Sequence, residues 1–147
     1  MARYATTVRT SLPPSEAFVF VAELTNLPQW DPGVETSRQV RGDGPGPDAA
    51  YEVKLANPQS MTLTYETTSY DGEALSTTLV AKYSWFTSVD TVTATPSGDG
   101  ADVTYDAELR LRGPLALGDL FLRPVFNKIG DKAARGLVKA LDGEKVA

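Results

Sequence analysis

The sequence predicts an α+β domain in which an antiparallel sheet of seven strands packs against a long C-terminal helix. Three observations predict it: segments that alternate apolar and polar residues, short turn-forming separators between them, and an abrupt change of composition after Gly113. Beyond Gly113 the chain contains no Ser, Thr, Tyr or Trp, which suits a helix. A length of 147 residues is typical of one domain, so we expect residues 1–147 to form a single domain.

The chain begins with a strand followed by two short helices. Residues 3–12 are rich in β-branched side chains and are typical of a strand, which Pro13 and Pro14 end. Residues 15–24 carry apolar side chains at helical spacing. After a break, a second and very short helix is expected to run to about Trp30, where an Asp-Pro-Gly turn ends it.

The middle of the chain is a series of strands joined by short turns. Because parallel neighbours need long crossovers, short connections predict antiparallel pairing. The last strand alternates cleanly, which predicts one buried and one exposed face. Alternation is unclear in residues 74–83 and 85–95, so their inward faces stay open. The expected strands span residues 34–41, 50–56, 61–70, 74–83, 85–95 and 101–112.

The last segment is predicted to be one long amphipathic helix. An apolar stripe recurs every three or four residues, and four basic side chains lie nearly opposite it. Such a stripe is typical of a helix that lies across a sheet. The stripe consists of Leu122, Phe126, Ile129, Ala133, Leu137 and Ala140, and the basic residues are Lys128, Lys132, Arg135 and Lys139.

The composition excludes several kinds of chemistry. The chain has no His and no Cys, which excludes thiol nucleophiles, imidazole bases and metal sites that use either residue. We therefore expect no metal and no cofactor. The net charge of −5 argues against nucleic-acid binding. No signal peptide or membrane-spanning stretch is visible, so a cytoplasmic location is expected and stable membrane insertion is not. The oligomeric state stays open.

Two segments near the N-terminus resemble a known superfamily. Ser11 to Phe18 (SLPPSEAF) and Leu24 to Val34 (LTNLPQWDPGV) look like the opening of polyketide cyclase/dehydrase-type proteins, and Asp90 to Pro96 (DTVTATP) resembles their penultimate hairpin. These proteins belong to the START and birch-pollen-allergen (SRPBCC) superfamily. The resemblance implies the helix-grip fold, a curved sheet around the C-terminal helix. It also implies an apolar cavity that in relatives holds lipids, sterols, polyketides, quinones or plant hormones.

Aromatic residues on the strands are the first candidates for the wall of such a cavity. A tyrosine offers an apolar ring with a polar tip, which suits an apolar pocket with a few orienting hydroxyls. The same residues also fit an ordinary core, because buried tyrosines are common in sheet proteins. The residues expected to bind ligand are Tyr51, Met61, Leu63, Tyr65, Tyr83, Trp85, Val92, Tyr105, Leu122 and Phe126.

Asp90 and Tyr105 are the only candidates for catalysis. If Val92 and Ala94 point inward, the two-residue period of a strand points Asp90 inward as well. A carboxylate in an apolar cavity would have a raised pKa and fit a general base. The other register leaves Asp90 in water, and we favour this solvated interpretation. For Trp30 we favour anchoring of the short helix over stacking on a ligand.

Two functions fit these expectations. The first is a carrier, chaperone or sensor that binds a hydrophobic or aromatic small molecule, such as a lipid or polyketide. The alternative is a polyketide cyclase/aromatase-like enzyme that promotes enolisation, cyclisation or dehydration of a bound poly-keto chain. Because Tyr and Asp have ordinary pKa values of about 10 and about 3.9, far from neutrality, binding is favoured.

Overall fold

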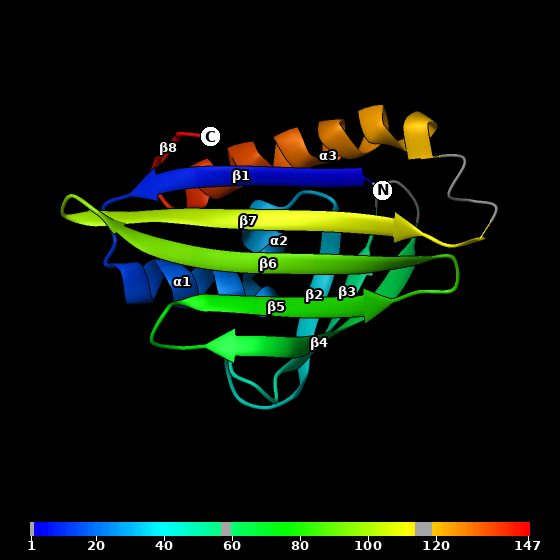
Figure 1. Ribbon diagram of the computed structural model, residues 1–147, viewed down its shortest axis with the longest axis horizontal. Coiled ribbons are helices and arrows are strands. Elements are labelled where there is room, and N and C mark those ends of the chain that lie inside the picture. The colour runs from blue at the N-terminus through cyan, green and yellow to red at the C-terminus, as the bar shows by residue number, and fades with distance from the viewer. Residues whose placement is uncertain (1, 57–59, 114–118) are drawn as a thin grey trace.

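The computed structural model describes residues 2–56, 60–113 and 119–147, with the backbone alone for residues 119–122. These residues form one antiparallel sheet in the order β2-β3-β4-β5-β6-β7-β1-β8, covered by helices (Figure 1). The strands are β1 Ala2–Thr10, β2 Val34–Arg41, β3 Ala50–Leu55, β4 Met61–Asp71, β5 Ser76–Lys82, β6 Phe86–Ser97, β7 Gly100–Leu111 and β8 Glu144–Lys145. The helical segments are α1 Pro14–Ala22, the single 3-10 turn η1 Leu24–Asn26, α2 Leu27–Trp30 and α3 Asp119–Ala140.

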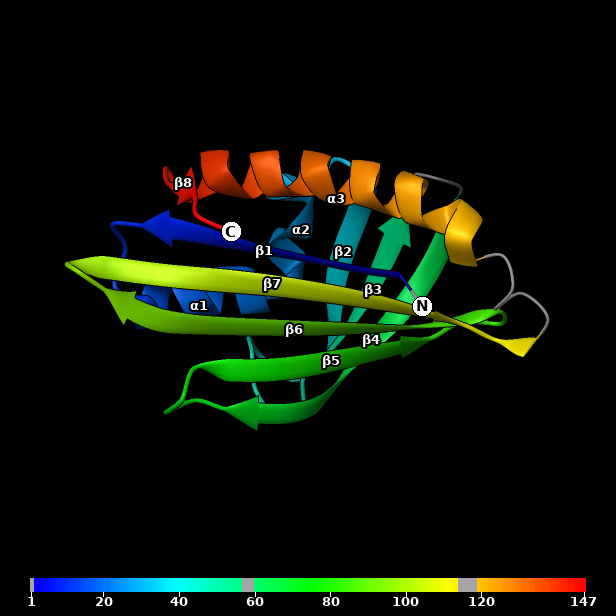
Figure 2. The same cartoon turned by 45° about the horizontal axis from the view of Figure 1, so that its top comes forward.

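The sheet is strongly curved. The β2–β3 register shifts twice, between Val34 and Thr36 and between Gln39 and Arg41, and the β4–β5 register shifts between Thr67 and Ser69. Such bulges bend a strand and increase its twist. As a result β2 and β3 run steeply across the direction of β6 and β7, and α3 lies along the open side of the curved sheet (Figures 1 and 2).

The predicted architecture is confirmed, with one addition. All seven expected strands, the short helices after the first strand and the long C-terminal helix are present. The addition is β8, which was not predicted and whose two residues pair with Val8 and Arg9 of β1. The apolar stripe of α3 is buried at Leu137, but Ala140 is exposed and Leu141 is buried in its place. Leu141 lies four residues after Leu137, and its N–H still bonds the carbonyl oxygen of Leu137 at 2.9 Å, so helical spacing places both on the face that meets the core.

The structure shows which face of β6 points inward. Residues with even numbers from Phe86 to Ala94 are buried, and those between them are only partly buried. Asp90 is 6% exposed and therefore points inward. The favoured interpretation of Asp90 as a solvated residue is wrong, because Val92 and Ala94 belong to the core and the strand period carries Asp90 with them.

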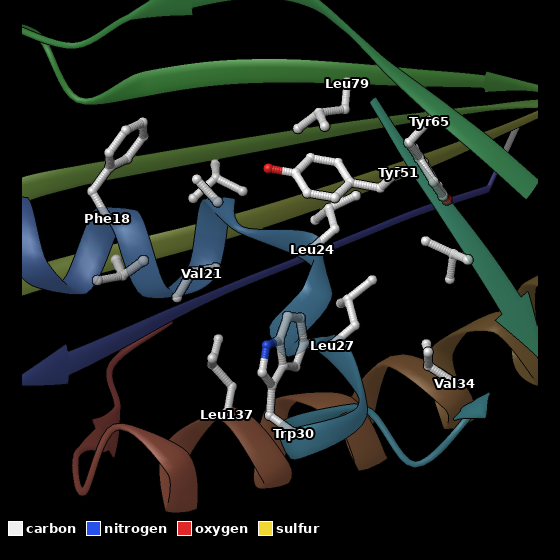
Figure 3. Packing of buried hydrophobic residues seen from close by; sticks show 14 of the residues in the cluster. Phe18, Val21, Leu24, Leu27, Trp30, Val34, Tyr51, Tyr65, Leu79 and Leu137 are labelled. Carbon is white, nitrogen blue, oxygen red and sulfur yellow. The ribbon is translucent and has the colours of Figure 1, made fainter. Parts of the chain in front are cut away.

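The core fills the space between the curved sheet and the helices. Figure 3 shows Tyr51, Leu24 and Leu79 packed together near α1, while Trp30 lies beside Leu137 of α3. The interpretation of Trp30 as an anchor of the short helix is confirmed, because its side chain is 5% exposed and belongs to this core.

Two glycines allow α3 to approach its neighbours closely. A Cβ atom at Gly136 would lie 1.8 Å from the carbonyl oxygen of Trp30, and one at Gly130 would lie 2.4 Å from the ring of Tyr4. Real Cβ atoms do not approach other atoms so closely, so no larger residue fits either position without movement of the backbone or ring. The glycines thereby set the distance from α3 to α2 and β1.

Candidate functional site

A cavity of about 200 Å³ lies between the concave face of the sheet and α3. Most of its wall is apolar, and the wall includes Gly130, which is part of the close approach of α3 to β1. Val125 of α3 also lines the cavity, and its side chain is 45% exposed, so it forms part of the rim. The apolar wall includes Leu27, Trp30, Val34, Val53, Leu55, Met61, Leu63, Trp85, Phe86, Ala107, Leu109, Val125, Phe126, Ile129, Ala133 and Ala134.

One wall of the cavity carries a chain of hydrogen-bonded side chains from three strands. The hydroxyls of Tyr65 and Ser88 lie 2.9 Å apart, and Ser88 donates to Oδ1 of Asp90 at 2.9 Å. Tyr105 donates to Oδ2 of Asp90. All four side chains line the cavity. The chain therefore runs Tyr65–Ser88–Asp90–Tyr105 and places one carboxyl group at its centre; we call it the polar wall.

The strand register explains how these residues meet. Ser88 and Asp90 are two residues apart on β6, so both side chains point to the same face. Tyr105 pairs with Val92 across β6 and β7, which makes it a diagonal neighbour of Asp90. Tyr65 and Ser88 both pair with Ala81 of the intervening strand β5. Because Ala81 is small, the long tyrosine side chain reaches over it to Ser88.

When Asp90 is ionised, the donor of each hydrogen bond in the polar wall is fixed. A carboxylate only accepts, so Ser88 and Tyr105 donate to it. Because Ser88 has a single hydroxyl hydrogen, it must accept from Tyr65. All three hydroxyls then point their hydrogens along the chain toward the carboxylate, and the buried charge is stabilised by charge-assisted hydrogen bonds.

Burial changes the acidity of these groups. It raises the pKa of Asp90 from its ordinary value of 3.8 to about 6, against the lowering effect of the hydrogen bonds from Tyr105 and Ser88. The pKa values of Tyr65 and Tyr105 are raised well above 10, first by burial and then by the negative charge of Asp90. The site therefore has a carboxyl group that titrates near neutral pH and two phenols that stay protonated.

A second carboxyl group, Asp31, also lines the cavity. It follows α2, and its Oδ1 accepts a hydrogen bond of 2.9 Å from the backbone N–H of Gly33. Burial raises its pKa, and its charge contributes to the raised pKa of Asp90. Asp31 was not predicted as a site residue, because an Asp-Pro-Gly turn gives no sign of which way its carboxylate points.

Trp30, next to Asp31, forms part of the same wall. Its ring meets the ring of Tyr105 edge-on, with centroids 5.3 Å apart and planes at 69°. Such an edge-to-face contact holds both aromatic rings in place. Trp30 therefore both anchors α2 in the core and presents its ring to the cavity.

Six of the ten residues expected to bind ligand line the cavity: Met61, Leu63, Tyr65, Trp85, Tyr105 and Phe126. The side chain of Leu122 lies outside the described residues. The other three, Tyr51, Tyr83 and Val92, point inward or pack on the core but do not reach the cavity.

These three residues lie elsewhere because the cavity occupies only part of the concave face. Tyr51 is fully buried among core residues near α1, on the other side of the core from α3 (Figure 3). Val92 is also fully buried, and α1 packs against its strand β6. Tyr83 lies at the turn after β5, with its ring 5.3 Å from that of Phe86. An inward-facing residue near α1 is therefore part of the solid core.

The described lining of the cavity contains no Lys or Arg, and the chain has no His. In the described part of the chain, no three acidic side chains gather where they would hold a metal ion. The same residues include no helix that is long and apolar enough to cross a membrane.

Fold and site together define a helix-grip domain with an internal cavity. A model of the family described as polyketide cyclase / dehydrase and lipid transport matches residues 1–142, so the chain belongs to this family. No curated protein matches the chain.

Solved structures share the fold at low sequence identity. A START superfamily protein from Mycobacterium smegmatis is 12% identical, with a TM-score of 0.77 over 97% of this chain and 98% of that one. The Zhui aromatase/cyclase from Streptomyces sp. R1128 is 9% identical, with a TM-score of 0.75 over 95% and 93%. The protein TTHA0849 from Thermus thermophilus is 21% identical, with a TM-score of 0.71 over 96% and 93%.

Proposed function

We propose that the protein binds a hydrophobic or aromatic small molecule in the cavity beneath α3, as a carrier, chaperone or sensor. The observation that carries the proposal is the cavity itself, with its apolar wall and the few polar groups, the polar wall among them, that converge on it. Such sites hold a ligand by burial of apolar surface, and a few polar groups orient it. Membership of a family described by cyclisation, dehydration and lipid transport supports the same conclusion.

The volume of the cavity indicates the size of the ligand. An apolar cavity of roughly 150 Å³ holds one benzene molecule. A cavity of about 200 Å³ is therefore suited to one substituted aromatic ring or a short acyl chain. A sterol or a long fatty acid is larger than this cavity and would fit only if α3 moved away from the sheet.

A cavity-filling substitution on α3 tests this function. Ala133 lines the cavity, and Ala133→Phe would place a phenyl ring in it. Ala140 lies two turns further along the same helix and is exposed, so Ala140→Phe is the matched control. Titration with phenethyl alcohol, followed by NMR of the backbone amides, should show shifts at residues around the cavity.

The expected result is that Ala133→Phe weakens binding about tenfold or more, a loss of ~1.4 kcal/mol, while Ala140→Phe leaves it unchanged. Circular dichroism verifies that both variants fold. If Ala133→Phe bound the alcohol as well as the unmodified protein does, the ligand would not occupy this cavity. If freshly purified protein carried no hydrophobic adduct in native mass spectrometry and bound no small aromatic compound, the binding function itself would be wrong.

A second candidate function is enolisation of a bound ketone, as in a cyclase/aromatase-like enzyme. The observation that favours it is the position of Asp90, a carboxyl group in an apolar cavity whose pKa is raised to about 6. A general base is most effective when its pKa is close to the working pH. Asp90 would take a proton from the carbon next to the carbonyl. Because Asp90 is then neutral, the hydroxyl of Tyr105, which had donated to the carboxylate, could turn to donate its hydrogen bond to the enolate oxygen.

Exchange of that carbon-bound proton for deuterium in heavy water measures this reaction directly. Benzyl methyl ketone is a suitable probe, because it is small enough for the cavity. Asp90→Asn should abolish the catalysed exchange, and Tyr105→Phe should slow it by about 10²-fold or more, the usual range for removing one proton-transfer or hydrogen-bond group. Equal exchange rates in the unmodified protein and both variants would refute the enzyme function and leave the binding function standing.

A further inference from the structure

The cavity has an unbalanced charge. Asp31 and Asp90 both line it, and no described lining residue is basic. Asp31 lies close enough to the polar wall for its charge to matter, since it contributes to the raised pKa values of Asp90, Tyr65 and Tyr105. Whatever enters the cavity therefore meets carboxyl oxygens with no cation to balance them.

This charge discriminates between ligand head groups. An anionic head would be buried beside like charges, which is costly in an environment with little water. A cationic head would instead pair with a carboxylate, and such charge-assisted hydrogen bonds are about twice as strong as neutral ones. The rings of Trp30, Tyr105 and Trp85 also line the cavity, and aromatic faces attract cations.

We propose that the cavity selects a small hydrophobic amine, whose protonated amino group pairs with Asp31 and Asp90 while its apolar body fills the space beneath α3. This proposal rests on the binding function proposed above and specifies its ligand class. Fatty acids and other carboxylates are correspondingly rejected.

The carboxyl oxygens still have capacity to accept. Oδ1 of Asp31 accepts the N–H of Gly33, and no described residue donates to its Oδ2. Each oxygen of Asp90 accepts one hydroxyl, and a carboxylate oxygen has room for a second donor. The bonds from Ser88 and Tyr105 also hold Asp90 in place, so that little side-chain entropy is lost when a ligand binds.

Three ligands of one shape test whether the cavity prefers an amine or binds any small aromatic compound. Phenethylamine, phenethyl alcohol and phenylacetic acid share a benzyl body and differ in the charge of the head group at pH 7.5. Affinity is measured by NMR titration at low salt. The amine should bind about tenfold or more tightly than the alcohol, and the acid more weakly than the alcohol by a similar factor.

Substitutions show whether the carboxyl groups cause the preference. Asp90→Asn and Asp31→Asn should each reduce the ratio of amine to alcohol affinity by about threefold or more, and the double variant should bring it close to one. Asp43 lies in an exposed loop, so Asp43→Asn is the matched control and should leave the ratio unchanged.

The possible results distinguish failure of the amine proposal from failure of the binding function. If the alcohol binds and the amine binds no better, or the acid binds best, the amine proposal is refuted and the binding function stands. If none of the three binds, both are refuted for ligands of this size. If Asp90→Asn does not fold, Asp31→Asn and the three affinities of the unmodified protein still decide the proposal.

Discussion

The buried carboxyl group of Asp90 makes the stability of the protein depend on pH in an unusual direction. Its pKa is about 6 in the folded protein and returns to its ordinary value of 3.8 when the chain unfolds. Between these pH values the folded state holds the proton and the unfolded state releases it, so the free energy of unfolding falls as pH rises. Each pKa unit is worth about 1.4 kcal/mol, so the ionised Asp90 destabilises the fold by ~3 kcal/mol above pH 6.

Asp90→Asn isolates this effect. An asparagine has the shape of a neutral aspartic acid, and the polar wall remains satisfied if its carbonyl oxygen accepts from Tyr105 and its amide donates to Ser88. The variant should therefore match the unmodified protein near pH 4 and exceed its free energy of unfolding by ~3 kcal/mol at pH 7.5.

Urea denaturation of both proteins at half-unit steps from pH 4 to 7.5 measures this difference. Because the other carboxyl groups are common to both proteins, their contributions largely cancel in the difference. The pKa of Asp90 is raised by the charges of Asp31 and Asp106. The negative charge of Asp90 in turn raises the pKa values of Tyr65 and Tyr105, so both phenols stay protonated throughout this range. Removal of a donor in Tyr105→Phe should move the midpoint to higher pH, because the hydrogen bond from Tyr105 lowers the pKa of Asp90. A stability difference that stays constant from pH 4 to 7.5 would refute the reasoning.

Two further predictions concern the packing of α3. Gly136→Ala should lower the free energy of unfolding by ~1–3 kcal/mol, because the new Cβ would lie 1.8 Å from the carbonyl oxygen of Trp30. Gly46→Ala, where nothing lies within 4 Å of the new atom, is its control and should change stability by less than ~0.5 kcal/mol; equal effects in urea denaturation would contradict the close approach. Leu137→Ala should cost ~2–5 kcal/mol in the same assay, because Leu137 is fully buried between α3 and the core; a loss below ~1 kcal/mol would show that α3 packs only loosely there.

The fold could be predicted because its determinants are local. The two-residue period of the last strand places Val103 in the core, and Tyr105, Ala107 and Leu109 of the same face line the cavity. The opposite face is less exposed than expected, since Asp102 and Thr104 are half-buried. Proline and glycine mark the turns, and the spacing of apolar residues marks α3. The strand β8 was missed because two exposed residues carry no period, and their pairing with β1 depends on where α3 ends.

The site was harder to predict because it depends on contacts between distant residues. Asp90 faces the cavity because Val92 and Ala94, on the same face of β6, are buried in the core. No property of Asp90 itself indicates this orientation. The hydrogen bond between Tyr65 and Ser88 requires a small residue at position 81 of the strand between them. Tyr51 points inward like Tyr65, but η1 packs against its strand β3, and Tyr51 belongs to the core while Tyr65 lines the cavity.

The absence of histidine does not leave the cavity without a group that titrates near neutral pH. Burial gives Asp90 a pKa of about 6, close to the ordinary value of about 6.5 for histidine, but in Asp90 the charged form is the deprotonated one. When ionised, Asp90 accepts from Ser88 and Tyr105, and the cavity presents negative charge. When protonated, it has one hydrogen to donate; if Ser88 accepts it, Ser88 turns its own hydrogen toward Tyr65, and the hydroxyl of Tyr65 is released to donate elsewhere. A chain of hydroxyls around one buried carboxyl group therefore offers an acceptor above pH 6 and a donor below it.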